Sequence, residues 1–506
     1  MGRLARTARA SDQRRTHVQA FGARRGGDNK LSDDSSAQDA ELETAVGIAA
    51  AVKRKDVSAR EMVDRALDRI ESSDEKLNAF VHVDPELARG EAAKVDDAIA
   101  RGEEVGALAG VPFGVKDMDS CAGMPVSYGS LIHKGHAPAE HDSVHVSRLR
   151  GAGAIAVGMT SCSEFGTVHF THTKAWGTTR NPWNTDLTPG GSSGGSGATV
   201  AAGAVPFATA GDGGGSTRIP AAFSGLLGMK PSYGRIPREE ASTSQTAVWG
   251  ALTRTVADSA RHLDITSGPD DRDRTSLPAS GIVYERAIEE LDTSGLRAAW
   301  SPDLGYARVD AEVLEIAEAA AVGLIGAAKL EHVDRPIELT EPVKAWLGTG
   351  AIDIWLHLEN DDWPDRASEL VGHVRRNFEA TESLPVPVYA RFMRRRHRLE
   401  LEVAELFRDI DVLLTPTTAV PAFDARSPRD VKIDGEPVDP ALTVPFTMLA
   451  NLCWNPAISI PAGLTRAGLP VGLQVTARRH CDEVPLRLAR IAELINPWPR
   501  TAPGWY

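Results

Sequence analysis

The chain has 506 residues, of which 42% are hydrophobic and 25% charged, and this composition excludes disulfide-stapled miniproteins and largely disordered proteins. A net charge of −13 argues against a general nucleic-acid or anionic-membrane binder, so we expect neither as a partner. The charge is uneven: eight basic and two acidic side chains give residues 1–30 a net charge of +6, which leaves −19 on the remaining chain.

Residues 1–38 predict a basic, disordered N-terminal extension. The segment is rich in arginine but lacks the apolar stretch of a secretory signal, and a disordered tail or an upstream start site is favoured over an organelle transit peptide. Four scattered cysteines without a Cys-x-x-Cys pair indicate a reducing, cytoplasmic location. No run approaches the roughly 18 apolar residues of a membrane span.

The remaining chain alternates between helical and strand patterns. Ser58 and Glu61 form a capping-box signature that opens one of the helices. The apolar spacing predicts helices over residues 40–54, from 58 onward, up to about 101, around 143–150 and over 196–203. Buried strands are predicted at residues 79–83, 111–116, 154–158, 205–210 and 411–416, and a long loop at 177–191. This alternation predicts an α/β fold with a parallel or mixed sheet.

Glycine is concentrated in two tracts. Ten of the 46 glycines fall between Gly190 and Gly215, and nine of these ten lie in residues 189–197 and 211–220. A flexible linker would not return to a buried helix and strand between the tracts. Three glycines before a serine can aim backbone N–H groups at one anion, either a phosphate or the oxyanion of acyl transfer, although a plain tight turn is the simpler interpretation. No phosphate-binding motif is present.

A nucleophilic serine needs a base. A G-x-S-x-G match at residues 191–195 lacks the upstream strand of a nucleophile elbow, whereas Ser216 follows a predicted strand. The clustered histidines match no metal motif, so we interpret them as surface or loop residues and expect no metal: His133, His136, His141, His145, His169 and His172. Lys116 ends an apolar run, where desolvation would lower its pKa, although alone it would be interpreted as a solvated lysine.

Together these segments resemble the amidase signature family of serine hydrolases. The resemblance extends from about residue 40 to the C-terminus and is strongest in GVPFGVKD, TPGGSSGGSG and GDGGGSTRIP, with weaker matches in DVLLTPT and NPAISIPAGL. It implies one large domain, residues 39–506, with a central twisted mixed β-sheet covered by helices. Within this domain, residues 111–236 would be the catalytic core segment and residues 259–440 a variable region on the substrate side.

The resemblance also implies the site residues. Lys116 matches the family's base, Ser192 the bridging serine, which follows a cis peptide bond from Gly191, and Ser216 the nucleophile. Asp212 and Arg218 resemble a supporting ion pair. The expected oxyanion hole consists of the backbone N–H groups of Gly213, Gly214, Gly215 and Ser216. No cofactor is implied. Gly213 stands where the family often has threonine or isoleucine, which predicts a more flexible loop.

The implied activity is hydrolysis of the C–N bond of small carboxamides, with aryl amides, carbamates or esters as further candidates, through an acyl-enzyme. The alternative is the glutaminase subunit of a tRNA-dependent amidotransferase, although that subunit usually reads S-I-R-Q-P where this chain has Ser216-Thr217-Arg218-Ile219-Pro220. The partner would be a small amide, and a homodimer is the expected assembly. Trp346, Trp355 and Trp363 favour core packing over a substrate surface.

Overall fold

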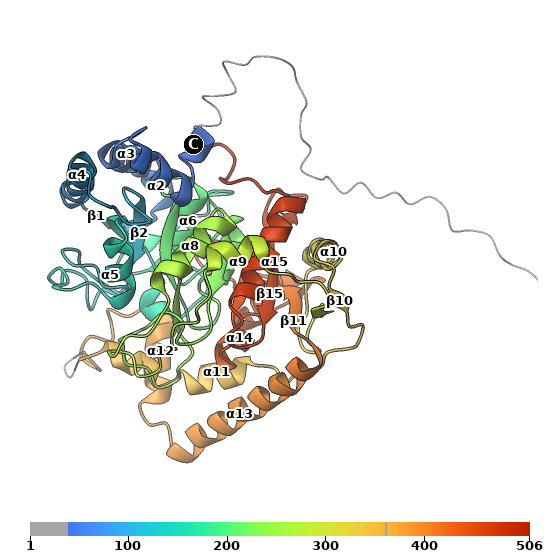
Figure 1. Cartoon of the computed structure of the whole chain (residues 1–506). Coiled ribbons are helices and arrows are strands. Elements are labelled where there is room, and N and C mark those ends of the chain that lie inside the picture. The colour runs from blue at the N-terminus through green and yellow to red at the C-terminus, as the bar shows by residue number, and fades with distance from the viewer. Residues whose placement is uncertain (1–38, 360–361) are drawn as a thin grey trace, which may run out of the picture.

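The computed structural model describes residues 39–359 and 362–506, so the predicted extension at residues 1–38 lies outside the described residues. The chain folds around an eleven-stranded mixed sheet with helices packed around it (Figure 1). The predicted α/β class, with a central mixed sheet covered by helices, is confirmed. Across the two described ranges, every helix is too short or too polar to span a bilayer.

The strands of the sheet lie in an order that brings distant parts of the chain together. From one edge to the other they are β1 Phe80–Val83, β3 Ile155–Thr160, β2 Pro112–Lys116, β6 Phe207–Asp212, β8 Val248–Thr253, β7 Leu227–Lys230, β14 Ala457–Leu464, β15 Pro470–Ala477, β11 Val412–Pro416, β9 Arg297–Trp300 and β10 Glu331–His332. Two short ribbons pair β4 His172–Thr173 with β5 Gly177–Thr178, and β12 Lys432–Ile433 with β13 Glu436–Pro437.

The helices fall along the chain between these strands. They are α2 Ala45–Arg54, α3 Ala59–Leu77, α4 Pro85–Ala100, α5 Val144–Gly151, α6 Gly194–Ala201, α7 Arg218–Ser224, α8 Val256–Thr266, α9 Tyr284–Glu290, α10 Ala311–Ala327, α11 Val343–Thr349, α12 Gly372–Thr381, α13 Val386–Asp409, α14 Met448–Leu452 and α15 Glu483–Ile495. Short 3-10 turns are η1 Glu164–Gly166, η2 Asp353–His357 and η3 Pro440–Thr443. Figure 1 shows α11, α12 and α13 grouped at the lower side of the molecule.

Local signals in the sequence explain most of the boundaries. The predicted capping box at Ser58 and Glu61 is present and opens α3. The first predicted helix begins later than expected, at Ala45, because the Thr44 side chain accepts a hydrogen bond from the Gly47 N–H and caps it there. The loop predicted at residues 177–191 contains the two-residue strand β5 at its start.

Two charged residues lie at the carboxyl ends of neighbouring strands in the sheet. β2 and β6 are parallel neighbours, with Phe113 paired to Phe207. Lys116 is the last residue of β2 and Asp212 the last of β6, so both lie where parallel strands end together. In α/β sheets, ligands usually bind just beyond the carboxyl ends of the strands.

Candidate active site

Lys116 and Ser192 form a buried pair. The Lys116 Nζ donates a hydrogen bond of 2.7 Å to Ser192 Oγ, and both residues are 2% exposed. The Lys116 ammonium is shielded from solvent, and within the described ranges no carboxylate lies within 4.0 Å of it to form an ion pair. Burial therefore lowers the pKa of Lys116 from 10.5 to about 8. A large share of this amine is neutral in mildly alkaline solution and able to accept a proton.

The backbone before Ser192 has the predicted geometry. The Gly191–Ser192 peptide bond is cis, which confirms the expectation drawn from the resemblance. A Cβ at Gly191 would lie 2.6 Å from the Phe170 nitrogen, so no larger residue fits. Ser192 is followed at once by α6, in the same way that Ser216 is followed by α7.

Ser216 is half-buried and lines the same cavity as Lys116 and Ser192. Within the described ranges, no hydrogen bond joins the hydroxyl groups of Ser192 and Ser216. The structure thus pairs two of the three predicted catalytic side chains and brings the third to their cavity. Catalytic hydrogen bonds are often long without substrate and tighten when it binds.

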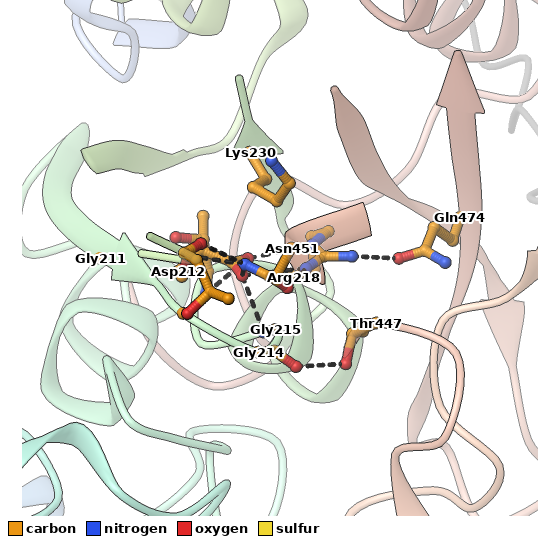
Figure 2. Close-up of polar contacts among 12 residues, drawn as sticks. Gly211, Asp212, Gly214, Gly215, Arg218, Lys230, Thr447, Asn451 and Gln474 are labelled. Atoms are coloured by element: carbon orange, nitrogen blue, oxygen red, sulfur yellow. Dashed lines mark hydrogen bonds and ion pairs between the residues drawn. The ribbon is translucent and has the colours of Figure 1, made fainter. Parts of the chain in front are cut away.

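A buried ion pair anchors the loop before Ser216. Both Arg218 and Asp212 are fully buried, and Arg218 donates to the Asp212 carboxylate through Nε at 3.0 Å and Nη2 at 2.9 Å. Arg218 also donates to Gln474 at 2.7 Å and to Asn451 at 2.6 Å, which ties the loop to β15 and α14 (Figure 2). Burial would raise the pKa of Asp212, but the charge and hydrogen bonds of Arg218 lower it to about 2.

The amide of Gly215 departs from the expected oxyanion hole. Its N–H donates to Asp212 Oδ1 at 2.7 Å, so it is already engaged in the buried network. At Gly215 φ is +127°, and a Cβ there would collide with Thr447. Glycine is therefore required for the turn itself. The amides of Gly213, Gly214 and Ser216 remain as the candidate oxyanion donors.

Two side chains from other parts of the chain hold the carbonyl groups of the same loop. Thr447 Oγ1 donates to the Gly214 carbonyl at 2.6 Å, and Trp346 Nε1 donates to the Gly213 carbonyl at 2.7 Å. The loop at Gly213 is thus hydrogen-bonded at its carbonyl, although the residue type predicts flexibility. A Cβ at Gly213 would meet only Ala247, at 3.6 Å, which is an ordinary contact.

The three tryptophans of the variable region divide between two roles. Trp355 and Trp363 pack against the Phe378 cluster, as the core interpretation predicts. Trp346 packs partly buried against another core cluster, and in addition it lines the cavities on both sides of Ser216. Its isolated position in the sequence carries no signal of this role.

The histidine prediction is wrong for His145. His145 is fully buried in α5, where it bonds to Asp119 at 2.8 Å and to His262 at 2.8 Å. His133 lies in a turn, as predicted for a loop residue, although it is buried against the His357 carbonyl. Among residues 39–359 and 362–506, no three His, Cys, Asp or Glu side chains form a group able to hold a metal ion.

Two cavities meet at Ser216. The smaller, of about 270 Å³, is lined by Lys116, Ser192 and Asp212. The larger, of about 900 Å³, extends from Gly214 and Ser216 toward α12 and residues 426–448. Residues that line both cavities form the wall between them: Gly166, Thr167, Ser216, Trp346 and Leu347. A substrate bound across this wall would place its two halves in different surroundings.

Comparison with known proteins identifies the family. The amidase family model matches residues 61–486, and the chain belongs to the amidase signature family, whose members are hydrolases of amide C–N bonds. An acylamidase of Rhodococcus erythropolis is 35% identical over 473 residues, covering 91% of this chain and 97% of that protein.

Two further relatives extend the comparison. A glutamyl-tRNA(Gln) amidotransferase subunit from Synechococcus sp. (strain CC9605) is 34% identical over 449 residues, covering 83% of this chain and 89% of that protein. Among solved structures, a bacterial aryl acylamidase of the amidase signature family superimposes with a TM-score of 0.83 at 30% identity. That match covers 90% of this chain and 96% of the aryl acylamidase.

The buried ion pair generates a stability prediction. Arg218→Met removes one partner and leaves the Asp212 carboxylate buried without its counter-charge, which should lower the free energy of unfolding by about 3–5 kcal/mol. Urea denaturation followed by circular dichroism measures the change. Arg54→Met is the matched control, because Arg54 is half exposed in its pairs with Glu41 and Asp56 and should barely move the midpoint. Equal midpoint shifts in the two variants would contradict the assigned anchoring role.

Proposed function

We propose that the chain hydrolyses small carboxamides, including aryl amides, through an acyl-enzyme formed on Ser216. The observation that carries the proposal is the buried 2.7 Å hydrogen bond from Lys116 Nζ to Ser192 Oγ, in a cavity that Ser216 also lines. A serine is a weak nucleophile until a base takes its proton. A desolvated lysine with a pKa of about 8 is such a base, and Ser192 lies beside it to pass the proton.

In the proposed first half-reaction, Ser216 Oγ attacks the amide carbonyl carbon. Its proton passes to Ser192 Oγ while the Ser192 proton passes to neutral Lys116. The carbonyl oxygen becomes an oxyanion, and the N–H groups of Gly213, Gly214 and Ser216 are the proposed donors that stabilise it. Collapse of this intermediate breaks the C–N bond, and Lys116 returns its proton through Ser192 to the departing nitrogen.

In the second half-reaction, water replaces the amine. The same relay takes a proton from the water as its oxygen attacks the ester carbon on Ser216, and returns that proton to Ser216 Oγ as the acid leaves. In this cycle, every proton that is transferred passes through the side chains of Ser216, Ser192 and Lys116.

The glutaminase alternative has support from the 34% identity to the Synechococcus amidotransferase subunit. Against it, the residues after the nucleophile are Thr217-Arg218-Ile219-Pro220 rather than I-R-Q-P. We therefore favour a stand-alone amidase.

A substrate panel with active-site variants tests the proposal. Purified protein should release amine from anilides and simple carboxamides and should react with a fluorophosphonate probe. Ser216→Ala should abolish both activities, because the atom that forms the acyl bond is gone. Ser192→Ala and Lys116→Ala should each lower kcat at least about a hundredfold, because proton transfer contributes roughly 10²–10⁴ in rate.

Glutamine belongs in the same panel. Ammonia release from glutamine, with anilides left untouched, would instead support the glutaminase function. Circular dichroism and thermal unfolding should show each variant folded. Ser163→Ala is the matched control, since the hydroxyl of this buried serine bonds to the Val168 backbone. Unchanged turnover in Ser216→Ala would refute the nucleophile assignment.

The pKa of Lys116 predicts the pH profile. Lysine must be neutral to accept a proton, and its pKa in the folded protein is about 8, so kcat/KM should rise through pH 8 to an alkaline plateau. Between pH 7 and the plateau the increase should be about tenfold, since only about one lysine in ten is neutral one pH unit below its pKa. Initial rates with a neutral anilide across pH 6–10 measure this profile.

A second buried lysine provides the control. Burial lowers the pKa of Lys230 to about 7, and its ammonium donates to the Pro231 carbonyl rather than to a catalytic group. Lys230→Met should keep the midpoint near pH 8. A midpoint that disappears in Lys230→Met would assign the titration to Lys230, and a rate that falls from pH 7 to pH 9 in folded protein would exclude a lysine base.

A further inference from the structure

The larger cavity has an apolar interior and a basic mouth. Its apolar lining comes from several segments and includes Phe170, Ile219, Val371, Val444 and Met448. Its cationic lining residues are Lys174, Arg376, Arg426 and Arg429, and Asp439 is the carboxylate among the lining residues that the structure describes. A cavity of about 900 Å³ with this lining suits a ligand that is apolar along its length and anionic at one end.

The positive charges at the mouth are not neutralised by neighbouring carboxylates. Over residues 39–359 and 362–506, no carboxylate lies within 4.0 Å of the guanidinium nitrogens of Arg376, Arg426 or Arg429. The Lys174 ammonium donates to the Ser368 carbonyl at 2.9 Å, a neutral acceptor, and Asp439 accepts the Ala441 N–H at 2.9 Å. These cations therefore remain available to an anion, on a chain whose overall charge is negative.

The positive charge of the arginines at the mouth acts on two histidines in the cavity wall. His172 and His373 both line the cavity. Burial and then the charge of Arg426 lower the pKa of His172, and burial and then the charge of Arg376 lower the pKa of His373 to about 4. Both imidazoles are neutral at pH 7, so they do not compete for an anion and the arginines supply the positive potential.

The proton relay decides which half of a substrate occupies this cavity. Lys116 and Ser192 line the smaller cavity, and they must reach the nitrogen that leaves. The amine half therefore belongs in the smaller cavity and the acyl half in the larger one. Building on the proposed function, we propose that the preferred substrates are amides whose acyl group is a long apolar chain or ring system ending in a carboxylate or similar anion.

Matched substrates test this proposal. A series of 4-nitroanilides with acyl chains of increasing length is prepared in two forms, one ending in a carboxylate and one in a neutral methyl ketone. At low ionic strength, at least one chain length should show kcat/KM about tenfold or more higher for the carboxylate form. The preference should shrink toward unity in 0.5 M salt, because salt screens charges at an exposed mouth.

Charge removal locates the effect. The triple variant Arg376→Gln, Arg426→Gln and Arg429→Gln should reduce the carboxylate preference to about one. Arg408→Gln, on the exposed side of α13, is the control and should keep it. Equal rates for the two forms at every chain length would overturn the proposal while leaving the amidase function intact, whereas the absence of nitroaniline release from both forms would count against the proposed function itself.

A second, independent observation concerns Trp346. Its indole packs on Gly214 so closely that a Cβ there would lie 2.7 Å from Cε2, while its Nε1–H bonds to the Gly213 carbonyl at 2.7 Å. The Gly213–Gly214 peptide is trans and planar, so its C=O and N–H point in opposite directions. A hydrogen bond that fixes the Gly213 carbonyl therefore also fixes the direction of the Gly214 N–H.

The next peptide is held at both of its ends. Thr447 holds the Gly214 carbonyl, and Asp212 accepts the Gly215 N–H. The Gly214 N–H, by contrast, is one of the proposed oxyanion donors and must stay free for substrate. Its direction therefore depends on the hydrogen bond that Trp346 makes to the Gly213 carbonyl at the other end of the same peptide. The geometry points to Trp346 as a positioning residue that holds the Gly214 N–H toward the oxyanion.

Removing only the indole N–H tests this role. Trp346→Phe, or replacement by benzothienylalanine, which keeps the shape of the indole, should lower kcat about 10–100-fold with KM changed less than about threefold. The inhibition constant of a trifluoromethyl ketone, which forms an oxyanion on the nucleophile, should rise by the same factor as kcat falls.

Trp355→Phe is the matched control, because Trp355 Nε1 also donates a hydrogen bond, to Thr381 at 2.9 Å, within a separate cluster. It should leave kcat and inhibition unchanged. An unchanged kcat in the benzothienylalanine protein, or an effect confined to KM, would show that Trp346 only lines the cavities. A loss of kcat without any weakening of the ketone would exclude the oxyanion role.

Discussion

The buried ion pair between Asp212 and Arg218 is the interaction on which the site depends. Asp212 ends β6 and Arg218 begins α7, so the pair closes the turn that carries Ser216. The Asp212 carboxylate also accepts the Gly215 N–H and an amide proton of Asn451. An unpaired charge in this position would be expensive, and each additional hydrogen bond lowers the cost of keeping the pair out of water.

The same network joins the middle of the chain to its C-terminal part. Gln474 on β15 and Asn451 on α14 bind the free side of the Arg218 guanidinium, more than 200 residues away in sequence. The C-terminal part of the sheet therefore supports the turn before Ser216, while Lys116 and Ser192 reach the same cavity from the end of β2 and from the residues just before α6. Asp212 and Lys116 are both buried, but burial affects them differently. Asp212 stays ionised because it is paired with Arg218, whereas the pKa of Lys116 falls because no carboxylate pairs with it.

Much of this arrangement could be predicted from the sequence, because the informative signals are local. Continuous apolar runs marked β2 and β6, and the two glycine tracts marked the turns before Ser192 and Ser216. The contacts that hold the loop could not be predicted, since Trp346 and Thr447 lie in segments whose local sequence has no repeating pattern. His145 was misplaced for a related reason. Its helix of eight residues is too short for periodicity to show that the imidazole faces the core.

The shared wall between the two cavities has a consequence for the order of events. If, as proposed, Ser216 is the nucleophile and the amine half occupies the smaller cavity, the acyl group stays in the larger one, attached to Ser216, after the C–N bond breaks. The attacking water must then occupy the space that the amine has left, because that is the side where Lys116 and Ser192 can take its proton. Release of the first product would thus gate hydrolysis of the acyl-enzyme. Another small amine entering the same space would compete with water and turn hydrolysis into acyl transfer.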